Sequence, residues 1–141
     1  MVSNNARGAC LCGMLQYEVT LPSKWAAHCH CTMCRRAHGA AFVTWVGVAD
    51  WNFRIVRGAE HLTWHRSSPG SQRGFCNQCG SPLLFRSSRW PGETHVTYAS
   101  FTSAIDRVPG AHVFWDTHVD WVELADALPR RTAADLAPKG P

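Results

Sequence analysis

Cysteine is the residue whose number and spacing in this sequence point most directly to chemistry. The chain has seven cysteines, and they fall in three groups with C-x-C, C-x-C-x-x-C and C-x-x-C spacings. The three groups are Cys10 and Cys12, then Cys29, Cys31 and Cys34, and finally Cys76 and Cys79. In a reducing compartment such closely spaced thiols indicate metal ligation rather than a disulfide framework.

The last group has the sequence of a zinc knuckle. The thiolates of Cys76 and Cys79 can bind one tetrahedral ion, and Gly80 lets the backbone amides turn toward the sulfurs. A knuckle supplies two ligands, so a closed site needs two more, which Cys10 and Cys12 can provide. We therefore predict a structural four-cysteine zinc site that ties the N-terminal part to the middle of the chain.

The middle group places three thiolates within six residues, so one loop can present Cys29, Cys31 and Cys34 to a single ion. After the four-cysteine site is assigned, no cysteine remains to complete this one. Three protein ligands with an exchangeable fourth position are typical of catalytic zinc, whereas structural zinc sites have four. The sequence thus predicts a second, catalytic zinc site and two zinc ions per chain.

Three alternatives remain open at this point. His28, His30 or another histidine could complete a closed site, which would make both ions structural. The seven thiols could also group differently, because a sequence fixes spacing and not proximity. Finally, exposed thiolates of low pKa oxidise readily, so the three-cysteine loop could be a metal store or a redox sensor.

Basic side chains surround the three-cysteine loop. Arg35 and Arg36 follow Cys34 directly and could offset the negative charge of a zinc ion with three thiolates, or hold a substrate carboxylate. They could equally be a solvated pair. His28 and His30 flank Cys29, and we expect them beside the metal ligands, where His30 could act as a general acid or base near neutral pH.

The rest of the sequence predicts a mainly β body with little helix. Short runs rich in Val, Thr, Phe, Tyr and Trp, most of them bounded by turn residues, have the length and composition of strands. These predicted strands are residues 14–20, 42–48, 52–57, 61–65, 83–87, 95–100 and 112–115. A turn or two of helix could form around residues 34–40, 101–106 and 121–128. The aromatic and polar tract 112–121 could line a cleft, although such a run is more often a core strand and its turn.

Length and composition indicate one folded domain. The chain has 141 residues, of which 45% are hydrophobic and 17% charged, so it can bury a core. The Pro- and Ala-rich end predicts a flexible tail over residues 129–141, with a second one at 1–7. We expect the functional domain between residues 8 and 124.

The charge pattern argues against nucleic acid and membrane partners. The net charge is +4, but the longest basic runs are only the pairs Arg35-Arg36 and Arg130-Arg131. No apolar stretch approaches the roughly 20 residues that cross a bilayer, and residues 1–8 lack the apolar core of a secretion signal. The sequence therefore predicts a cytoplasmic location.

Taken together, the motifs resemble those of the glutathione-dependent formaldehyde-activating enzymes, which are grouped with centromere protein V-like proteins. The resemblance covers roughly residues 8–124 and includes all seven cysteines. The matching pieces are Gly8-x-Cys10-x-Cys12-Gly13, His28-Cys29-x-Cys31-x-x-Cys34-Arg35-Arg36-x-x-Gly39, Phe75-Cys76-x-x-Cys79-Gly80-Ser81 and His112-x-x-Trp115-x-x-x-x-x-Trp121.

This resemblance implies a β-tent fold of packed antiparallel sheets, with the structural and catalytic zinc ions on the cysteines assigned above. It also implies a carbon-sulfur lyase activity in which a glutathione-like thiol adds to formaldehyde or another small aldehyde, or is released from the adduct. His30 or a bound water would then supply the proton. The alternative is a non-catalytic, zinc-stabilised module that binds a protein or chromatin.

Overall fold

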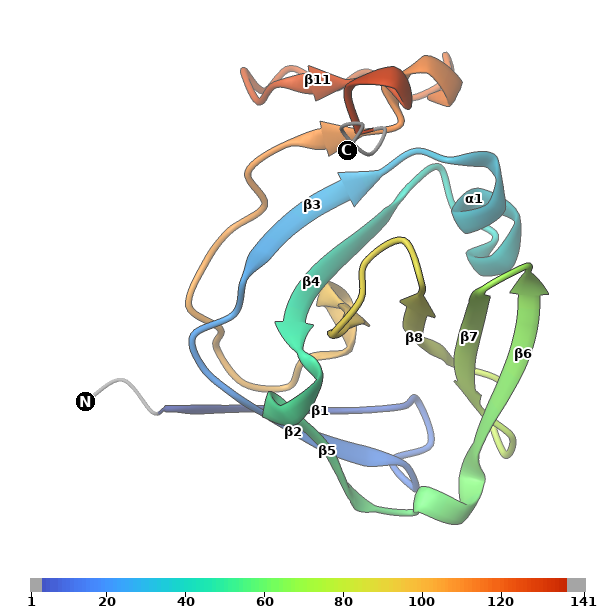
Figure 1. Ribbon diagram of the computed structural model, residues 1–141, viewed down its shortest axis with the longest axis vertical. Coiled ribbons are helices and arrows are strands. Elements are labelled where there is room, and N and C mark those ends of the chain that lie inside the picture. The colour runs from blue at the N-terminus through green and yellow to red at the C-terminus, as the bar shows by residue number, and fades with distance from the viewer. Residues whose placement is uncertain (1–3, 137–141) are drawn as a thin grey trace.

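Strands dominate the computed structural model, which describes residues 4–136 (Figure 1). The strands are β1 (Asn5–Ala9), β2 (Gln16–Thr20), β3 (Trp25–Cys29), β4 (Val43–Ala49), β5 (Phe53–Arg57), β6 (Leu62–Ser68), β7 (Ser71–Cys76), β8 (Pro82–Ser87), β9 (Glu93–Thr97), β10 (His112–Val113) and β11 (Arg130–Arg131). The α-helix is α1 (Thr32–His38), and the short 3-10 helices are η1 (Asp50–Asn52), η2 (Ala59–His61), η3 (Tyr98–Ser100), η4 (Trp115–Thr117) and η5 (Ala134–Leu136). The mainly β, single-domain fold predicted from the sequence is confirmed.

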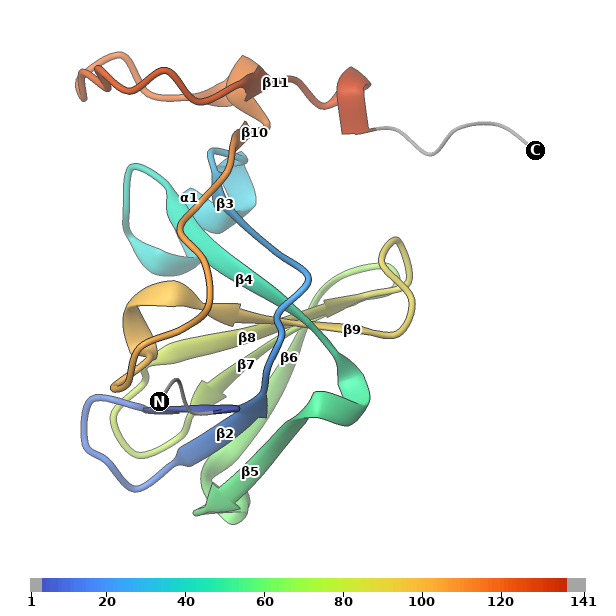
Figure 2. The same cartoon turned by 90° about the vertical axis from the view of Figure 1, so that its left-hand side faces the viewer.

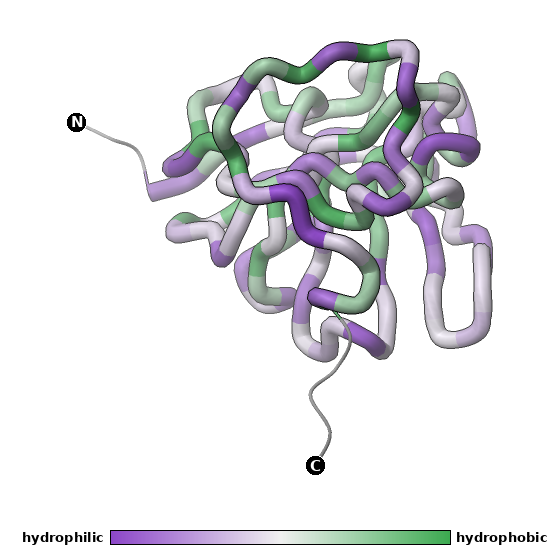
Figure 3. Tube along the Cα trace, turned by 90° about the horizontal axis from the view of Figure 1, so that it is seen from above, coloured by the Kyte–Doolittle hydropathy of each residue, from purple (hydrophilic) through white to green (hydrophobic). Residues whose placement is uncertain are grey.

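The strands form two sheets. A small antiparallel sheet has the order β1-β2-β5, and a large one has the order β11-β10-β3-β4-β9-β8-β7-β6. Within the large sheet β10 pairs in parallel with β3 and with β11, while the other pairs are antiparallel. Figure 2 shows the small sheet at one end of the large one. Figure 3 shows apolar and polar stretches alternating along the trace.

One face of the large sheet carries the main core. Val46, Val96 and Leu84 are cross-strand partners on β4, β9 and β8, so their side chains lie on the same face. They are almost fully buried and pack in one cluster with Tyr17 and Val19 of the small sheet. Burial of these side chains supplies the hydrophobic stabilisation that holds the two sheets together.

The opposite face of the large sheet carries aromatic side chains, and we call Trp25, Trp45, Phe85, Trp90 and His95 the aromatic face. Gly47 of β4 is essential to it. A Cβ atom built on Gly47 would lie 2.2 Å from Cε2 of Trp25, so only glycine lets that indole lie across β4. The indole thereby reaches the His95 ring, with 4.6 Å between ring centroids.

Each of the seven predicted strands overlaps an observed one, whereas β1, β3, β7 and β11 were not predicted. The missed segments have weak strand propensity: β3 reads Trp-Ala-Ala-His-Cys and β7 reads Ser-Gln-Arg-Gly-Phe-Cys. Pairing with neighbouring strands, rather than local preference, makes them strands.

Of the predicted helices, only the one near Cys34 exists as an α-helix, and it begins at Thr32. The helices expected at 101–106 and 121–128 are wrong. In each of these segments an aspartate is held by distant partners instead: Asp106 accepts hydrogen bonds from Ser23, and Asp126 contacts His112. These long-range bonds favour irregular backbone over a helix.

Parts of the two predicted flexible tails are held in regular structure. Residues 5–7 belong to β1, and β11 and η5 lie within the C-terminal stretch. The Arg130 side chain donates to the backbone oxygens of Leu124, Asp126 and Leu128, which fixes the approach to β11. Residues 1–3 and 137–141 of the predicted tails lie outside the described residues. None of the helices in residues 4–136 has the length and apolar character needed to span a bilayer.

Candidate metal centres

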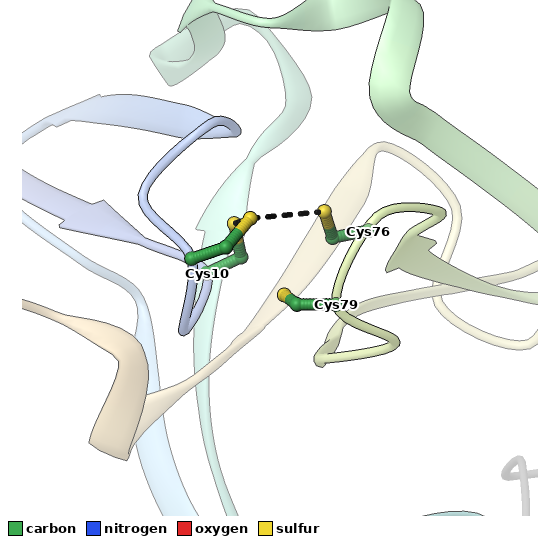
Figure 4. Close-up of side chains that lie close together, drawn as sticks. Cys10, Cys76 and Cys79 are labelled. Carbon is green, nitrogen blue, oxygen red and sulfur yellow. Dashed lines mark hydrogen bonds between the residues drawn. The ribbon is translucent and has the colours of Figure 1, made fainter.

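The sulfur atoms of Cys10, Cys12, Cys76 and Cys79 all lie within 4.8 Å of one another. The distance is 3.5 Å from Cys10 Sγ to Cys12 Sγ, and 3.9 Å from Cys12 Sγ to Cys76 Sγ. A tetrahedral zinc ion with Zn–S bonds of about 2.3 Å keeps its sulfurs about 3.8 Å apart. Figure 4 shows the Cys10, Cys76 and Cys79 side chains pointing toward one another from two loops. This four-cysteine group therefore fits zinc.

Tight backbone turns aim these sulfurs. Gly13 and Gly80 end the two cysteine loops with φ of 77° and 78°, a left-handed conformation that side chains disfavour. The turns direct backbone N–H groups at sulfur: the Leu15 N–H donates to Cys10 Sγ at 3.3 Å, and the Gln78 N–H donates to Cys76 Sγ at 3.4 Å. Such donors stabilise thiolates, which are the form that ligates metal.

The four-cysteine group joins the two sheets. Cys10 and Cys12 lie in the β1–β2 loop of the small sheet, and Cys76 and Cys79 lie at the end of β7 and in the β7–β8 loop of the large one. Ser81 adds a second link, since its Oγ accepts a hydrogen bond from the Leu11 N–H at 3.0 Å. This position across a sheet boundary fits a structural centre.

The second cysteine group lies where β3 ends and α1 begins. The sulfurs of Cys29, Cys31 and Cys34 are within 4.8 Å of one another. Cys31 is the N-cap residue of α1, and its sulfur accepts a hydrogen bond from the Cys34 N–H at 3.2 Å. Cys29 and Cys34 are buried, at 6% and 5% exposure, while Cys31 is only half-buried. Approach to this group is therefore easiest beside Cys31.

Among residues 4–136, no histidine or carboxylate joins this three-cysteine group. The nearby histidines have other partners. His28 Nδ1 lies 2.7 Å from Thr44 Oγ1, and His30 Nε2 lies 2.8 Å from His112 Nδ1. A site closed by one of these histidines is therefore not the arrangement observed.

Crowding of the three thiols changes their acidity unequally. Hydrogen bonds from the thiols of Cys29 and Cys34, together with the Cys34 N–H and the charge of Arg73, lower the pKa of Cys31 to about 2. The same contacts with Cys31 and Cys34 raise the pKa of the buried Cys29 thiol. Because adjacent thiolates repel one another, a bound cation is needed to ionise all three together.

The arginine that contacts the sulfurs is Arg73 and not the predicted Arg35. Arg35 donates from Nη1 to the backbone oxygen of Thr117 at 3.0 Å, and Arg36 is exposed. Arg73 of β7 instead donates from Nη2 to Cys34 Sγ at 3.6 Å. Sequence reasoning missed Arg73 because it is 39 residues from Cys34 and no local spacing marks it; only the fold brings β7 to α1.

The predicted catalytic residue His30 is buried, at 1% exposure, and its side chain lies outside the sulfur group. It forms a chain with His112 and Asp126, in which His112 Nε2 lies 3.0 Å from the Asp126 carboxylate. A carboxylate only accepts hydrogen bonds, so His112 Nε2 carries a proton. Burial and the neighbouring charges of His112 and His118 lower the pKa of His30 to about 4.

The aromatic tract at 112–121 packs around the cysteine loop. The His30 N–H donates to the Val113 oxygen at 3.0 Å, and Thr117 Oγ1 donates to the His30 oxygen at 3.0 Å. Trp115 meets the His30 ring edge-on, with centroids 4.9 Å apart. This tract therefore fixes the backbone that carries Cys29 and Cys31.

A mainly β domain that presents one four-sulfur and one three-sulfur group defines a class of cysteine-rich proteins able to bind zinc. The family model described as glutathione-dependent formaldehyde-activating enzyme matches residues 5–117. The chain belongs to this family. All seven cysteines lie inside the matched range.

Two known proteins are similar to the chain over most of its length. A protein of Halomonas elongata, provisionally described as a glutathione-dependent formaldehyde-activating enzyme, is 30% identical over 125 residues, covering 83% of this chain and 79% of that protein. A crystal structure of a Rhodobacter sphaeroides protein superposes with a TM-score of 0.60 at 25% identity, covering 89% of this chain and 99% of that one.

Proposed function

We propose that this protein is a zinc-dependent enzyme of the carbon-sulfur lyase type, which activates a small glutathione-like thiol for addition to, or release from, formaldehyde or another small aldehyde. The observation that carries the proposal is the convergence of Cys29, Cys31 and Cys34, with no fourth ligand in residues 4–136. A three-ligand group leaves one coordination position for a substrate. The family to which the chain belongs supports the thiol and aldehyde chemistry.

In this proposal the two cysteine groups have different roles. Cys10, Cys12, Cys76 and Cys79 hold a structural zinc that fastens the small sheet to the large one. Cys29, Cys31 and Cys34 hold the catalytic zinc, giving two ions per chain. When bound there, zinc would lower the pKa of a thiol in its open coordination position, so that the thiol reacts as a thiolate.

The chain's own residues shape the reaction. The small thiol approaches beside Cys31, the most accessible ligand, and its sulfur attacks the carbonyl carbon of the aldehyde. A carbon–sulfur bond forms, the carbonyl π bond breaks, and its oxygen takes a proton. A water molecule is the better proton source, because His30 is buried and shares its Nε2 with His112. His30 then serves to hold the cysteine loop.

The first experiment counts zinc per chain by elemental analysis and follows the metal–sulfur environment by X-ray absorption before and after glutathione is added. Two zincs, one of which changes its ligands with thiol, are expected. Exchange NMR spectroscopy of glutathione, formaldehyde and their adduct then measures turnover at equilibrium. Cys31→Ser should abolish it, whereas Met33→Ala, an exposed position between two ligands, should not.

The opposite result is equally informative. If both zincs have four protein ligands and their coordination does not change when glutathione is added, the enzyme proposal is wrong. The alternative is then a zinc-stabilised module that binds a protein or chromatin. Loss of one zinc with mild peroxide, fully reversed by reductant and without turnover, would instead indicate a redox sensor or metal store.

A further inference from the structure

Arg73 occupies a distinctive place on the large sheet. It lies on β7 opposite Phe85 of β8, and Phe85 in turn lies opposite His95 of β9. Cross-strand partners share a face, so Arg73 is on the same side of the sheet as the aromatic face. The hydrogen bond from Arg73 Nη2 to Cys34 Sγ shows that the Arg73 side chain reaches from β7 to the three-cysteine group at α1.

Two contacts fix the direction of the Arg73 guanidinium. Its Cζ lies 4.9 Å from the centroid of the Phe85 ring, so the planar cation rests against an aromatic side chain. Its Nη2 donates to Cys34 Sγ at 3.6 Å. The ring restrains the guanidinium while one nitrogen holds a ligand sulfur in place.

Two other nitrogens of the Arg73 guanidinium lack a partner within residues 4–136. Nε and Nη1 are buried and have no hydrogen-bond acceptor among the described residues. Leaving a buried charged donor unsatisfied is costly, so such groups in native proteins usually have an acceptor. A group bound at the three-cysteine site is a natural acceptor, since Nη2 of the same guanidinium already contacts that site.

The charge of the site points to an anionic acceptor. Zinc with three thiolates carries a net charge of about −1, and an anionic fourth ligand would make it about −2. A nearby guanidinium offsets that charge, and hydrogen bonds between ionised partners are about twice as strong as neutral ones. Arg35, whose Nη1 donates to the Thr117 oxygen, is directed to a different segment.

We propose that Arg73 is the positioning residue of the three-cysteine site: it holds Cys34 in its ligating position, and its free N–H donors receive the anionic ligand that completes the site. The proposal rests on the metal site of the proposed function but not on the reaction itself. It predicts two separable effects, one on metal retention and one on binding of a thiol.

Metal retention is tested with Arg73→Met, which keeps an apolar stem against Phe85 but removes the charge. Zinc loss to a coloured chelator is followed in time. One of the two zincs should be released about 10- to 100-fold faster, while the other, at the four-cysteine site, is unchanged and shows that the variant is folded. Arg73→Lys should restore part of the retention. Arg57→Met, an exposed change on β5, controls for net charge.

Ligand binding is tested on the cobalt-substituted protein, whose absorption reports the ligands of the metal. It is titrated with 2-mercaptoethanol, which has no carboxylate, and with 3-mercaptopropionate, which has one. Weaker binding of both thiols to Arg73→Met shows that Arg73 receives the thiolate. Weaker binding of 3-mercaptopropionate alone shows that it receives the carboxylate.

Wild-type release of both zincs from Arg73→Met, together with unchanged titrations, would overturn the proposal. If Arg73 acted through packing alone, Arg73→Met would release zinc at the wild-type rate, and Arg73→Lys would not improve zinc retention. Neither measurement involves formaldehyde. Suppose the wild-type protein shows no turnover, but Arg73→Met still loses zinc faster than the wild type does. The proposed function would then be wrong, and the inference about Arg73 would still hold.

Discussion

His30 and His112, 82 residues apart in the sequence, share a buried hydrogen bond of 2.8 Å. The bond ties the residue between Cys29 and Cys31 to β10, whose register with β3 places His112 opposite His28. Asp126 completes the chain from the surface side. The geometry of the three-cysteine loop thus depends on a segment far from it in the sequence.

Removing this link should weaken the fold. His112 is fully buried, so His112→Ala leaves a cavity and an unpaired donor on His30, and we expect the free energy of unfolding to fall by about 2–4 kcal/mol. Urea denaturation measures the loss. His118→Ala, at an exposed position stacked on Trp115, should cost less than about 1 kcal/mol. Equal losses of stability in His112→Ala and His118→Ala would contradict a structural role of the hydrogen bonds that link His30, His112 and Asp126.

Gly47 should tolerate no side chain. In Gly47→Ala the new methyl group would clash with the Trp25 indole at 2.2 Å, and the indole can escape only by giving up its contacts with His95 and Glu93. We expect a loss of about 2–3 kcal/mol in stability and a change in tryptophan fluorescence. In the matched variant Gly110→Ala the nearest atom is 4.0 Å away, so its stability should stay within about 0.5 kcal/mol of the wild type.

The four-cysteine group should control global stability. Cys76 is fully buried, so Cys76→Ala should reduce zinc from two ions to one per chain and lower the thermal midpoint by ten degrees or more, on the order expected for loss of a structural metal. Gln78→Ala, in the same loop but exposed, should keep both zincs. If Cys76→Ala retained two zincs and its midpoint, the grouping of the cysteines would be wrong.

The pH dependence of stability has a source away from the cysteines. Burial raises the pKa of Glu93, but hydrogen bonds from His95, Lys24 and Trp25 outweigh it and bring the pKa down to about 2. Because the pKa of Glu93 is lower in the folded state than in the unfolded state, its ionised carboxylate stabilises the fold. This stabilisation is fully present at pH values above the unfolded-state pKa of about 4.5, and it is lost as the pH falls toward the folded-state pKa of about 2.

The test compares the wild type with Glu93→Gln in urea. The variant should be less stable by about 1–3 kcal/mol at pH 7 and at about pH 5.5, and the gap should narrow at about pH 4. The difference between the two unfolding free energies at each pH removes the effect of acid on the cysteines, because that effect is common to both proteins. A gap that stayed constant down to pH 4 would show that the Glu93 carboxyl is not the titrating group.

Much of the metal chemistry could be predicted from local spacing. Within the pairs Cys10–Cys12 and Cys76–Cys79, and within the trio around Cys31, the sulfurs lie close together as predicted, because cysteines a few residues apart cannot be far apart in space. The two pairs meet only because the fold brings the β1–β2 loop to the end of β7 and the β7–β8 loop. The strands with β-branched and aromatic runs, such as β4, were also predictable, since their composition suits a half-buried pleated surface.

Other features depended on pairing across the sheet. β3 and β7 have weak strand propensity, yet β3 carries Cys29 and β7 carries Arg73. The prediction that Arg35 lies at the site came from its position next to Cys34, but its side chain is directed to Thr117. Adjacency in sequence fixes where a Cα atom lies and leaves the direction of a long side chain open.

The sequence by itself determined that the cysteines of each short motif lie together in a spacing able to bind metal, because the spacing of residues within a loop is a local property. Only the tertiary structure decided that the two cysteine pairs meet, and which charged and aromatic groups surround the cysteines. Arg73, His112 and Asp126 reach the three-cysteine loop through strand register and long-range hydrogen bonds. Those contacts are set by the packing of the whole sheet, and no short segment contains them.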